Sequence, residues 1–201
     1  MKNITYILVA ILTLACGTIF IHTLTRAYIA PPREEEVVVI EPVTPATPAQ
    51  PDAITPDRLQ IPVLHVDAHV QHVGMTKKGT MSVPSNYTDV GWYRHGSMPG
   101  DNGIAVFDGH VDNGVGLAGV FKHLKTLKAG DDIYIVNKEG KKIHFKVTGI
   151  QDFPHDTKDT ASIFQTTGTP SIKLITCEGE WNKELKTYMQ RLIVSAELVA
   201  S

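Results

Sequence analysis

Residues 4–24 form an uncharged stretch of 21 residues near the start of the chain. A helix of this length, rising about 1.5 Å per residue, is long enough to cross the hydrocarbon core of a bilayer. A cleaved signal peptide usually has a shorter apolar region, of about 7–15 residues, followed by a small-x-small site that is not evident here. The sequence therefore predicts an uncleaved anchor in residues 1–30, with a transmembrane helix at about residues 4–24.

A proline-rich segment follows the predicted anchor. Seven prolines occur between Pro31 and Pro56, and proline both fixes φ and removes a backbone donor. This composition favours an extended spacer at residues 31–57 over a helix or an inner strand. Basic residues flank the anchor on both sides and do not decide its orientation. The short N-terminal tail and the acidic residues 34–36 favour a single-pass protein of the cell membrane, with its N-terminus inside and its domain outside.

Residues 58–201 remain for one folded domain, and they read mainly as β structure. Seven segments alternate apolar and polar residues or form short apolar runs, as strands do: residues 58–62, 63–74, 103–108, 133–137, 142–149, 171–177 and 192–198. Residues 115–125 and 160–165 are the two segments that look helical. Many short strands with few helices predict a closed barrel or a sandwich.

Charge and cysteine content exclude several classes of protein. Nineteen basic residues against 21 acidic ones give a net charge of -2, so there is no basic excess to bind nucleic acid. Cys16 and Cys177 are the two cysteines, too few for a disulfide scaffold or a cysteine-rich zinc site. Cys16 lies in the predicted anchor, so Cys177 is the domain's single thiol. An unpaired thiol outside the cell is expected to be either buried or used.

Three residues at predicted strand ends form a candidate site. Cys177 is expected to end the strand at residues 171–177, where its side chain is exposed and rigidly placed. His110 follows another strand, and an imidazole is the group that raises the thiolate fraction of a cysteine nucleophile. Arg191 opens the last strand. If residues 178–190 form one loop, its guanidinium lies beside the thiol, where it lowers the thiol pKa or stabilises an oxyanion.

Each candidate also has a simpler interpretation. Cys177 is then a buried small hydrophobe, His110 a loop histidine capped by Asp112, and Arg191 a surface arginine. The simpler interpretation gives a membrane-tethered binding module with an inert Cys177, which is the alternative function.

A histidine cluster raises the question of a metal. His65, His69 and His72 have the spacing of one helix face, as in some metal sites. Their segment reads as a strand, however, and on a strand His72 does not share the face of the other two. We therefore expect no metal.

Together, these motifs resemble the sortases, which are membrane-anchored cysteine transpeptidases of monoderm bacteria. The family's strand motif Leu/Ile-x-Thr-Cys is matched at residues 174–177, its Gly-His motif at residues 109–110, and its arginine strand at residues 191–194. The resemblance covers residues 58–199 and agrees with the anchor and spacer. Residues 109–112 and the glycine-rich stretch after them are most similar to class F, with class E next.

The resemblance implies an eight-stranded β-barrel with one or two short helices, and a transpeptidase that needs no cofactor. The cysteine of such an enzyme attacks an LPxTG-like C-terminal sorting signal between Thr and Gly and forms a thioester. An amine from a cell-wall precursor or a pilin lysine then resolves the thioester. The implied partners are surface proteins that carry sorting signals, together with this amine acceptor.

The resemblance also implies roles for individual residues. Cys177 is the nucleophile, and His110 donates a proton to the leaving amine and takes one from the incoming amine. Arg191 and the backbone N–H of Glu178 stabilise the oxyanion, and Thr176 helps to place the substrate.

Two features near the motifs add to the resemblance or depart from it. Asp112, two residues after the motif histidine, is expected to orient the imidazole of that residue. Residues 178–180, Glu-Gly-Glu, replace a more neutral run common in class F relatives. This departure predicts a raised pKa for the cysteine thiol through like-charge repulsion, and a shifted preference among sorting signals.

Overall fold

The computed structural model describes residues 53–199 except residues 115, 159 and 161. The predicted anchor and nearly all of the predicted spacer lie outside the described residues. In the described part of the chain, no helix is long and apolar enough to span a membrane. Packing begins ahead of residue 58, because the Ile54 side chain is only 4% exposed and its backbone N–H donates to the Pro99 carbonyl at 3.0 Å.

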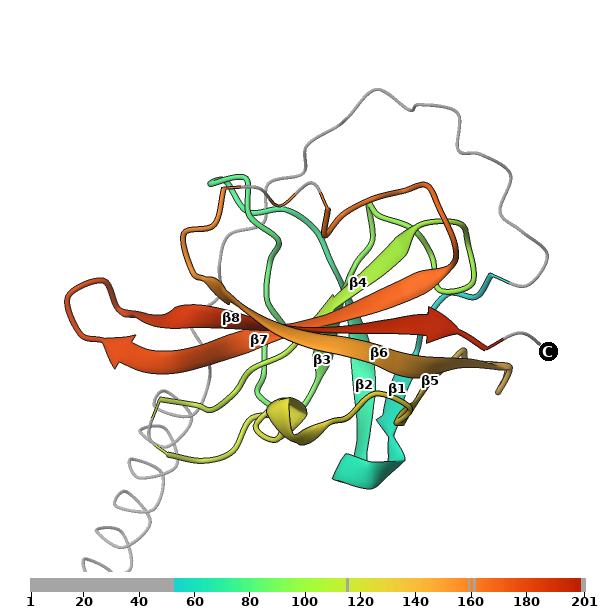
Figure 1. Cartoon of the computed structure of the whole chain (residues 1–201), viewed down its shortest axis with the longest axis horizontal. Helices are drawn as coiled ribbons and strands as arrows, with labels where there is room; N and C mark the ends of the chain where they lie inside the picture. The colour runs from blue at the N-terminus through green and yellow to red at the C-terminus, as the bar shows by residue number, and fades with distance from the viewer. Residues whose placement is uncertain (1–52, 115, 159, 161, 200–201) are drawn as a thin grey trace, which may run out of the picture. The chain divides into compact units, whose positions relative to one another are not determined.

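Eight strands in the described residues close into a barrel, which Figure 1 shows. Their bounds are β1 Arg58–Ile61, β2 Val66–Val73, β3 Val90–Tyr93, β4 Ile104–Asp108, β5 Asp132–Val136, β6 Lys142–Pro154, β7 Ser171–Asn182 and β8 Thr187–Leu198. The strand order is β1-β2-β3-β4-β7-β8-β6-β5, and β5 pairs with β1 to complete the circle. The expectation of a mainly β domain is confirmed, and the barrel is favoured over the sandwich.

Two neighbouring pairs in the barrel are parallel, and one of them determines where the chemistry lies. β2 pairs with β3 and β4 pairs with β7 in parallel, while the other pairings are antiparallel. Parallel strands end at the same edge of a sheet. The residues that follow β4 therefore lie beside the second half of β7, although the two segments are more than 60 residues apart in sequence.

Alternating side chains of all the longer strands fill the barrel. Burying a large apolar side chain contributes roughly 1.5–3 kcal/mol, so this interior is the main source of stability. Its fully buried members include Leu59, Ile61, Phe107, Ile133, Ile135, Phe145, Ile172, Leu174 and Val194.

A second apolar cluster covers the outer face of β4, β7 and β8. Ile104 and Val106 of β4 lie in this cluster with Ile163 and Ile193, whereas Ala105 and Phe107 belong to the interior. Because β4 is buried on both faces, its sequence is an unbroken apolar run rather than an alternating one.

Neither segment expected to be helical is a regular helix, although two short 3-10 helices occur in the described residues. The described residues of segment 160–165 form turns, and those of 115–125 form turns that lead into the three-residue 3-10 helix η2, Leu124–Thr126. A second 3-10 helix, η1, covers Pro62–Leu64. Gly114 and Gly116 have φ values of 74° and 92°, which a helix cannot adopt. Gly119 packs against the backbone of His110 so closely that a Cβ atom would clash with the His110 carbonyl.

The predicted ends of the last two strands also need correction. β7 continues five residues past Cys177, and β8 begins four residues before Arg191, so residues 178–190 are not one loop. They form most of a hairpin, which extends beyond the barrel in Figure 1. The register shifts between Glu178 and Trp181, where Gly179 has a φ of 83°. A bulge of this kind breaks the period-2 pattern, which hid the extension of both strands.

Candidate active site

Cys177 and Arg191 lie directly opposite each other in the β7–β8 ladder. Thr176, the residue before Cys177, is 4% exposed and faces the barrel interior. Since side chains alternate along a strand, the Cys177 side chain lies on the outer face. Opposed residues share a face of the sheet, so the Arg191 side chain projects from that same face.

The end of β4 brings His110 to the same part of the barrel. The last register pair of β4 and β7 joins Asp108 to Ile175. The Gly109 N–H then donates to the Ile175 carbonyl at 3.1 Å, and the Thr176 hydroxyl donates to the Gly109 carbonyl at 2.7 Å. These two bonds continue the strand register by one residue, so His110 comes level with the residue after Thr176, which is Cys177.

Two residues between β2 and β3 contact the imidazole of His110. Its Nε2 lies 3.1 Å from the Pro84 carbonyl oxygen, and its ring lies 4.8 Å from the ring of Tyr87, centroid to centroid. A carbonyl oxygen only accepts hydrogen bonds, so Nε2 carries a proton in this contact. Nδ1 is then the basic nitrogen of the neutral ring. Neither contact was predicted from the sequence.

Burial raises the pKa of the Cys177 thiol above its usual value. The positive charge of Arg191 lowers this pKa, whereas the negative charges of Asp108 and Asp112 raise it. The net direction is upward, because removing a thiolate from water outweighs the attraction of one cation. The protonated thiol is therefore the favoured resting form at neutral pH.

Burial lowers the pKa of His110, because the charged imidazolium is disfavoured away from water. The hydrogen bond to Pro84 and the charge of Asp112 act in the opposite direction and only partly offset the burial. The thiol and the imidazole therefore rest as a neutral pair. A thiolate–imidazolium pair is the minor form. Arg191 stabilises its thiolate, whereas Asp112 stabilises its imidazolium and disfavours its thiolate.

Asp112 is placed near His110, but its hydrogen bonds go elsewhere. Its Oδ1 accepts the Gly114 N–H at 2.9 Å, and its Oδ2 accepts the Tyr188 hydroxyl at 2.5 Å. The Lys122 ammonium lies 3.9 Å from Oδ2. Burial, followed by the hydrogen bond and charge of Asp112, raises the pKa of Tyr188 to about 12. Asp112 thus acts on the imidazole through its charge, and orientation by a direct bond stays a prediction.

The guanidinium of Arg191 is held along its own strand. Its Nη1 donates to the carbonyls of Tyr188 and Gln190, both at 2.9 Å, and its Nη2 donates to the Thr187 hydroxyl at 3.1 Å. A planar fork of donors can make these contacts while keeping one charge in a fixed place. The arrangement gives a rigid cation on the face that carries the thiol.

Glu178 does not act on the thiol as the sequence suggested. Its carboxylate pairs with the Lys125 ammonium at 2.9 Å. The acidic groups that raise the pKa of Cys177 are Asp108 and Asp112 instead. The ion pair joins the residue after the cysteine to the segment between β4 and β5, which also carries His110.

The histidines considered as metal ligands are not gathered. His65 precedes β2 with a φ of 54°, His69 approaches Asp89 with 3.6 Å between Nδ1 and Oδ2, and His72 contacts the Pro56 carbonyl at 2.9 Å. Among the described residues, no group of three or more His, Cys, Asp or Glu side chains is placed to hold a metal ion.

The described residues thus form a closed eight-stranded barrel with a cysteine and an arginine opposed on β7 and β8 and a histidine after β4. The family model for the sortase domain matches residues 59–199. The chain belongs to the sortase family. It is accordingly a sortase transpeptidase, an enzyme of the class that acts on sorting signals.

Solved sortase structures share this fold. Sortase C-1 from Actinomyces oris is 25% identical with a TM-score of 0.54, and the match covers 72% of this chain and 73% of that one. Sortase A from Corynebacterium diphtheriae is 21% identical with a TM-score of 0.55, over 74% of this chain and 62% of that one. Sortase C from Clostridium perfringens SM101 is 23% identical with a TM-score of 0.52, over 72% and 69%. No curated protein matches this sortase by sequence.

Proposed function

We propose that this sortase cleaves an LPxTG-like C-terminal sorting signal between Thr and Gly and transfers the new acyl end to an amine. The observation that carries the proposal is the direct opposition of Cys177 and Arg191 on the outer face of the β7–β8 ladder. The parallel pairing of β4 with β7 adds an imidazole at the same level. A thiol, a base and a fixed cation are the groups that acyl transfer requires.

In the first step, the sulfur of Cys177 attacks the carbonyl carbon of the scissile Thr-Gly bond. The thiol proton passes to Nδ1 of His110, which is the basic nitrogen when Nε2 donates to Pro84. The negative charge that develops on the carbonyl oxygen is stabilised by Arg191. The C–N bond then breaks, the imidazolium gives its proton to the leaving amine, and a thioester remains.

In the second step, an amine attacks the thioester carbon. The imidazole of His110 takes the proton of the incoming amine and returns it to the sulfur as the C–S bond breaks. The new amide joins the surface protein to its acceptor, and the enzyme returns to its neutral resting pair. The acceptor is an amine of a cell-wall precursor or a pilin lysine.

Neighbouring residues assist these steps. The buried hydroxyl of Thr176 holds the Gly109 carbonyl and so fixes the end of β4 next to the nucleophile. We assign the backbone N–H of Glu178 to the oxyanion. The side chain of Thr176 faces the interior, so it places the substrate only indirectly, through the end of β4. The charge of Asp112 supports the imidazolium that forms in both steps.

The proposal includes location and class. A single-pass anchor at residues 4–24, with the N-terminus inside, would hold the barrel outside the cell membrane, where sorting signals and wall precursors meet. We assign the enzyme to class F on residues 109–112 and the glycines that follow them, with class E as the second choice.

The test is a transfer reaction with the full chain in detergent micelles, an LPxTG-type peptide and a glycine-based amine. Intact mass should show a thioester on wild-type protein and ligated peptide in solution, and Cys177→Ala should give neither. The result against the proposal is a panel of sorting peptides that yields no adduct and no product, together with a thiol that resists alkylation in the folded protein. That result would favour the alternative of an inert Cys177.

A further inference from the structure

The His110 imidazole takes both of its described ring contacts from one short segment, residues 84–87, which lies between β2 and β3. Pro84 accepts the hydrogen bond of Nε2, and the Tyr87 ring packs against the imidazole at 4.8 Å. The Tyr87 carbonyl also accepts the Val120 N–H at 2.8 Å. The Phe121 N–H donates to the His110 carbonyl at 3.0 Å. Two consecutive residues after His110 therefore bond the backbones of Tyr87 and His110, whose rings are in contact.

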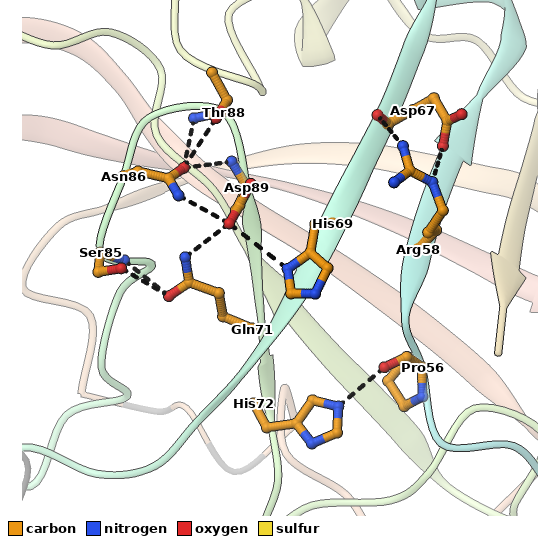
Figure 2. Close-up of polar contacts among 10 residues, drawn as sticks. All are labelled: Pro56, Arg58, Asp67, His69, Gln71, His72, Ser85, Asn86, Thr88 and Asp89. Carbon is orange, nitrogen blue, oxygen red and sulfur yellow. Dashed lines mark hydrogen bonds and ion pairs between the residues drawn. The ribbon is translucent and has the colours of Figure 1, made fainter. Parts of the chain in front are cut away.

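Polar side chains hold this segment to β2, as Figure 2 shows. We call Gln71, Ser85, Asn86 and Asp89 the bracing network. The Gln71 amide oxygen accepts both the N–H and the hydroxyl of Ser85, at 3.0 and 3.1 Å, and the Gln71 amide nitrogen donates to Asp89 Oδ2 at 2.9 Å. The same Oδ2 accepts from the Asn86 amide at 2.8 Å.

Asn86 closes the segment into a turn from within. Its Oδ1 accepts the N–H and hydroxyl of Thr88, both at 3.0 Å, and the N–H of Asp89 at 2.8 Å. This pattern is an Asx-type turn, in which a side chain replaces a backbone partner. Gln71 therefore bonds both ends of this turn, at Ser85 and Asp89, and Tyr87 lies in the middle of the turn.

We propose that Gln71, acting through the bracing network, is a positioning residue for His110 that keeps the imidazole in its Nε2-protonated form. The bracing network fixes Ser85, which follows Pro84 in the chain, and so fixes the carbonyl that accepts from Nε2. With Nε2–H committed to Pro84, Nδ1 is the nitrogen that can exchange a proton with the thiol. Gln71 touches neither the substrate nor the reacting atoms.

This inference rests on the proposed role of His110 in proton transfer. A neutral imidazole in water exists as two tautomers, and a base that presents the wrong nitrogen cannot accept the thiol proton. Small displacements of a catalytic group also have large effects on rate, because about 1 Å of misplacement can slow a reaction about 100-fold. The bracing network would limit both the population of the wrong tautomer and the displacement of the imidazole.

The first measurement is the tautomer of His110, which does not depend on activity. The full chain in micelles is labelled with 15N-histidine, and the His110 signals are assigned among nine histidines by loss in His110→Gln. At about pH 8, well above the usual imidazole pKa, the wild-type protein should show a protonated Nε2 and an unprotonated Nδ1. In Gln71→Leu and Asn86→Ala, the 15N chemical shifts of both ring nitrogens of His110 should move towards the average of the two tautomers.

The second measurement is the transpeptidation rate of the same variants. We expect kcat to fall about tenfold or more in Gln71→Leu, with KM changed by less than about twofold, because substrate contacts are untouched. Asp67→Ala is the matched control. Asp67 lies on the same strand and bonds Arg58 at 2.7 Å, away from the turn, and its loss should change neither the tautomer nor kcat.

The two measurements separate the inference from the function beneath it. Unchanged His110 shifts in both Gln71→Leu and Asn86→Ala would overturn the role of the bracing network. Altered shifts with an unchanged kcat would leave the positioning intact and refute proton transfer by His110. If thermal melting shows that Gln71→Leu does not fold, Asn86→Ala decides the question alone. The Asn86 side chain is only half-buried, so we expect its removal to be tolerated.

Discussion

Tyr188 donates a hydrogen bond to Asp112 across 76 residues of sequence and so joins the strand of Arg191 to the segment that carries His110. The bond is 2.5 Å long, within the range of a hydroxyl donating to a carboxylate. Together with the Lys125–Glu178 ion pair, it ties the β7–β8 hairpin to the segment between β4 and β5. The two sides of the candidate active site are therefore held together by contacts that flank it.

The first prediction concerns this bond. Tyr188→Phe removes the hydroxyl and keeps the ring, so the free energy of unfolding should fall by about 1–2 kcal/mol, as for a half-buried bond to a charged group. Urea denaturation of Tyr188→Phe, Asp112→Ala and the double variant gives the coupling between the two side chains, because each single variant removes the bond. A coupling energy of zero within error would mean that the bond does not hold the two segments together.

The second prediction concerns the charge of Asp112. Asp112→Asn keeps an acceptor for Tyr188 and removes a negative charge that stabilises the imidazolium and disfavours the thiolate. The pKa of His110 should therefore fall further, and the pKa of Cys177 should also fall, since Asp112 raises both. Histidine NMR titration and the pH dependence of thiol alkylation measure the two values. Opposite movements of the two values would show that the charge of Asp112 is not what sets them.

The third prediction separates the charge of Arg191 from its shape. Arg191 lowers the pKa of Cys177, so Arg191→Gln should raise that pKa, whereas Arg191→Lys should leave it nearly unchanged. Lysine nevertheless loses the fork that bonds Tyr188, Gln190 and Thr187. The transpeptidation rate of both variants should therefore drop about tenfold or more. A rate for Arg191→Lys within about twofold of wild type would remove the specific role of the guanidinium.

Periodicity predicted the barrel because most strands have one face inside and one outside. It failed where a strand departs from that condition. β3 was missed because it is short and contains Gly91. Any larger residue at this position would bring its Cβ atom into the Asp108 side chain and Val73. The extension of β7 was missed because the bulge at Gly179 breaks the alternation.

The sequence predicted the reacting groups of the candidate site but not the residues that hold those groups in place. His110, Cys177 and Arg191 each belong to a short local motif, and each motif adjoins a strand that can be recognised from its own sequence. The contacts of Tyr188, Pro84 and Gln71 were not predicted, because their partners lie 76, 26 and 14–18 residues away along the chain. Only the closed barrel, with β4 parallel to β7, determines which distant residues meet.

The last prediction concerns Thr176, whose side chain faces the interior while its neighbour faces the substrate side. Its hydroxyl donates to the Gly109 carbonyl at 2.7 Å in a buried position, which fixes the residue before His110. Thr176→Val keeps the shape and leaves that carbonyl without its donor, so the free energy of unfolding should fall by about 1–3 kcal/mol. Thr176→Ser keeps the hydroxyl and serves as the control, losing only a methyl group.

Activity distinguishes positioning by Thr176 from stability alone. If the bond places His110 beside Cys177, Thr176→Val should lower kcat at temperatures where the variant is fully folded, and Thr176→Ser should restore most of the rate. Circular dichroism sets that temperature, and the peptide transfer reaction gives kcat. Equal rates for Thr176→Val and Thr176→Ser in the folded range would contradict the positioning role, because the two variants differ in the hydroxyl that reaches Gly109.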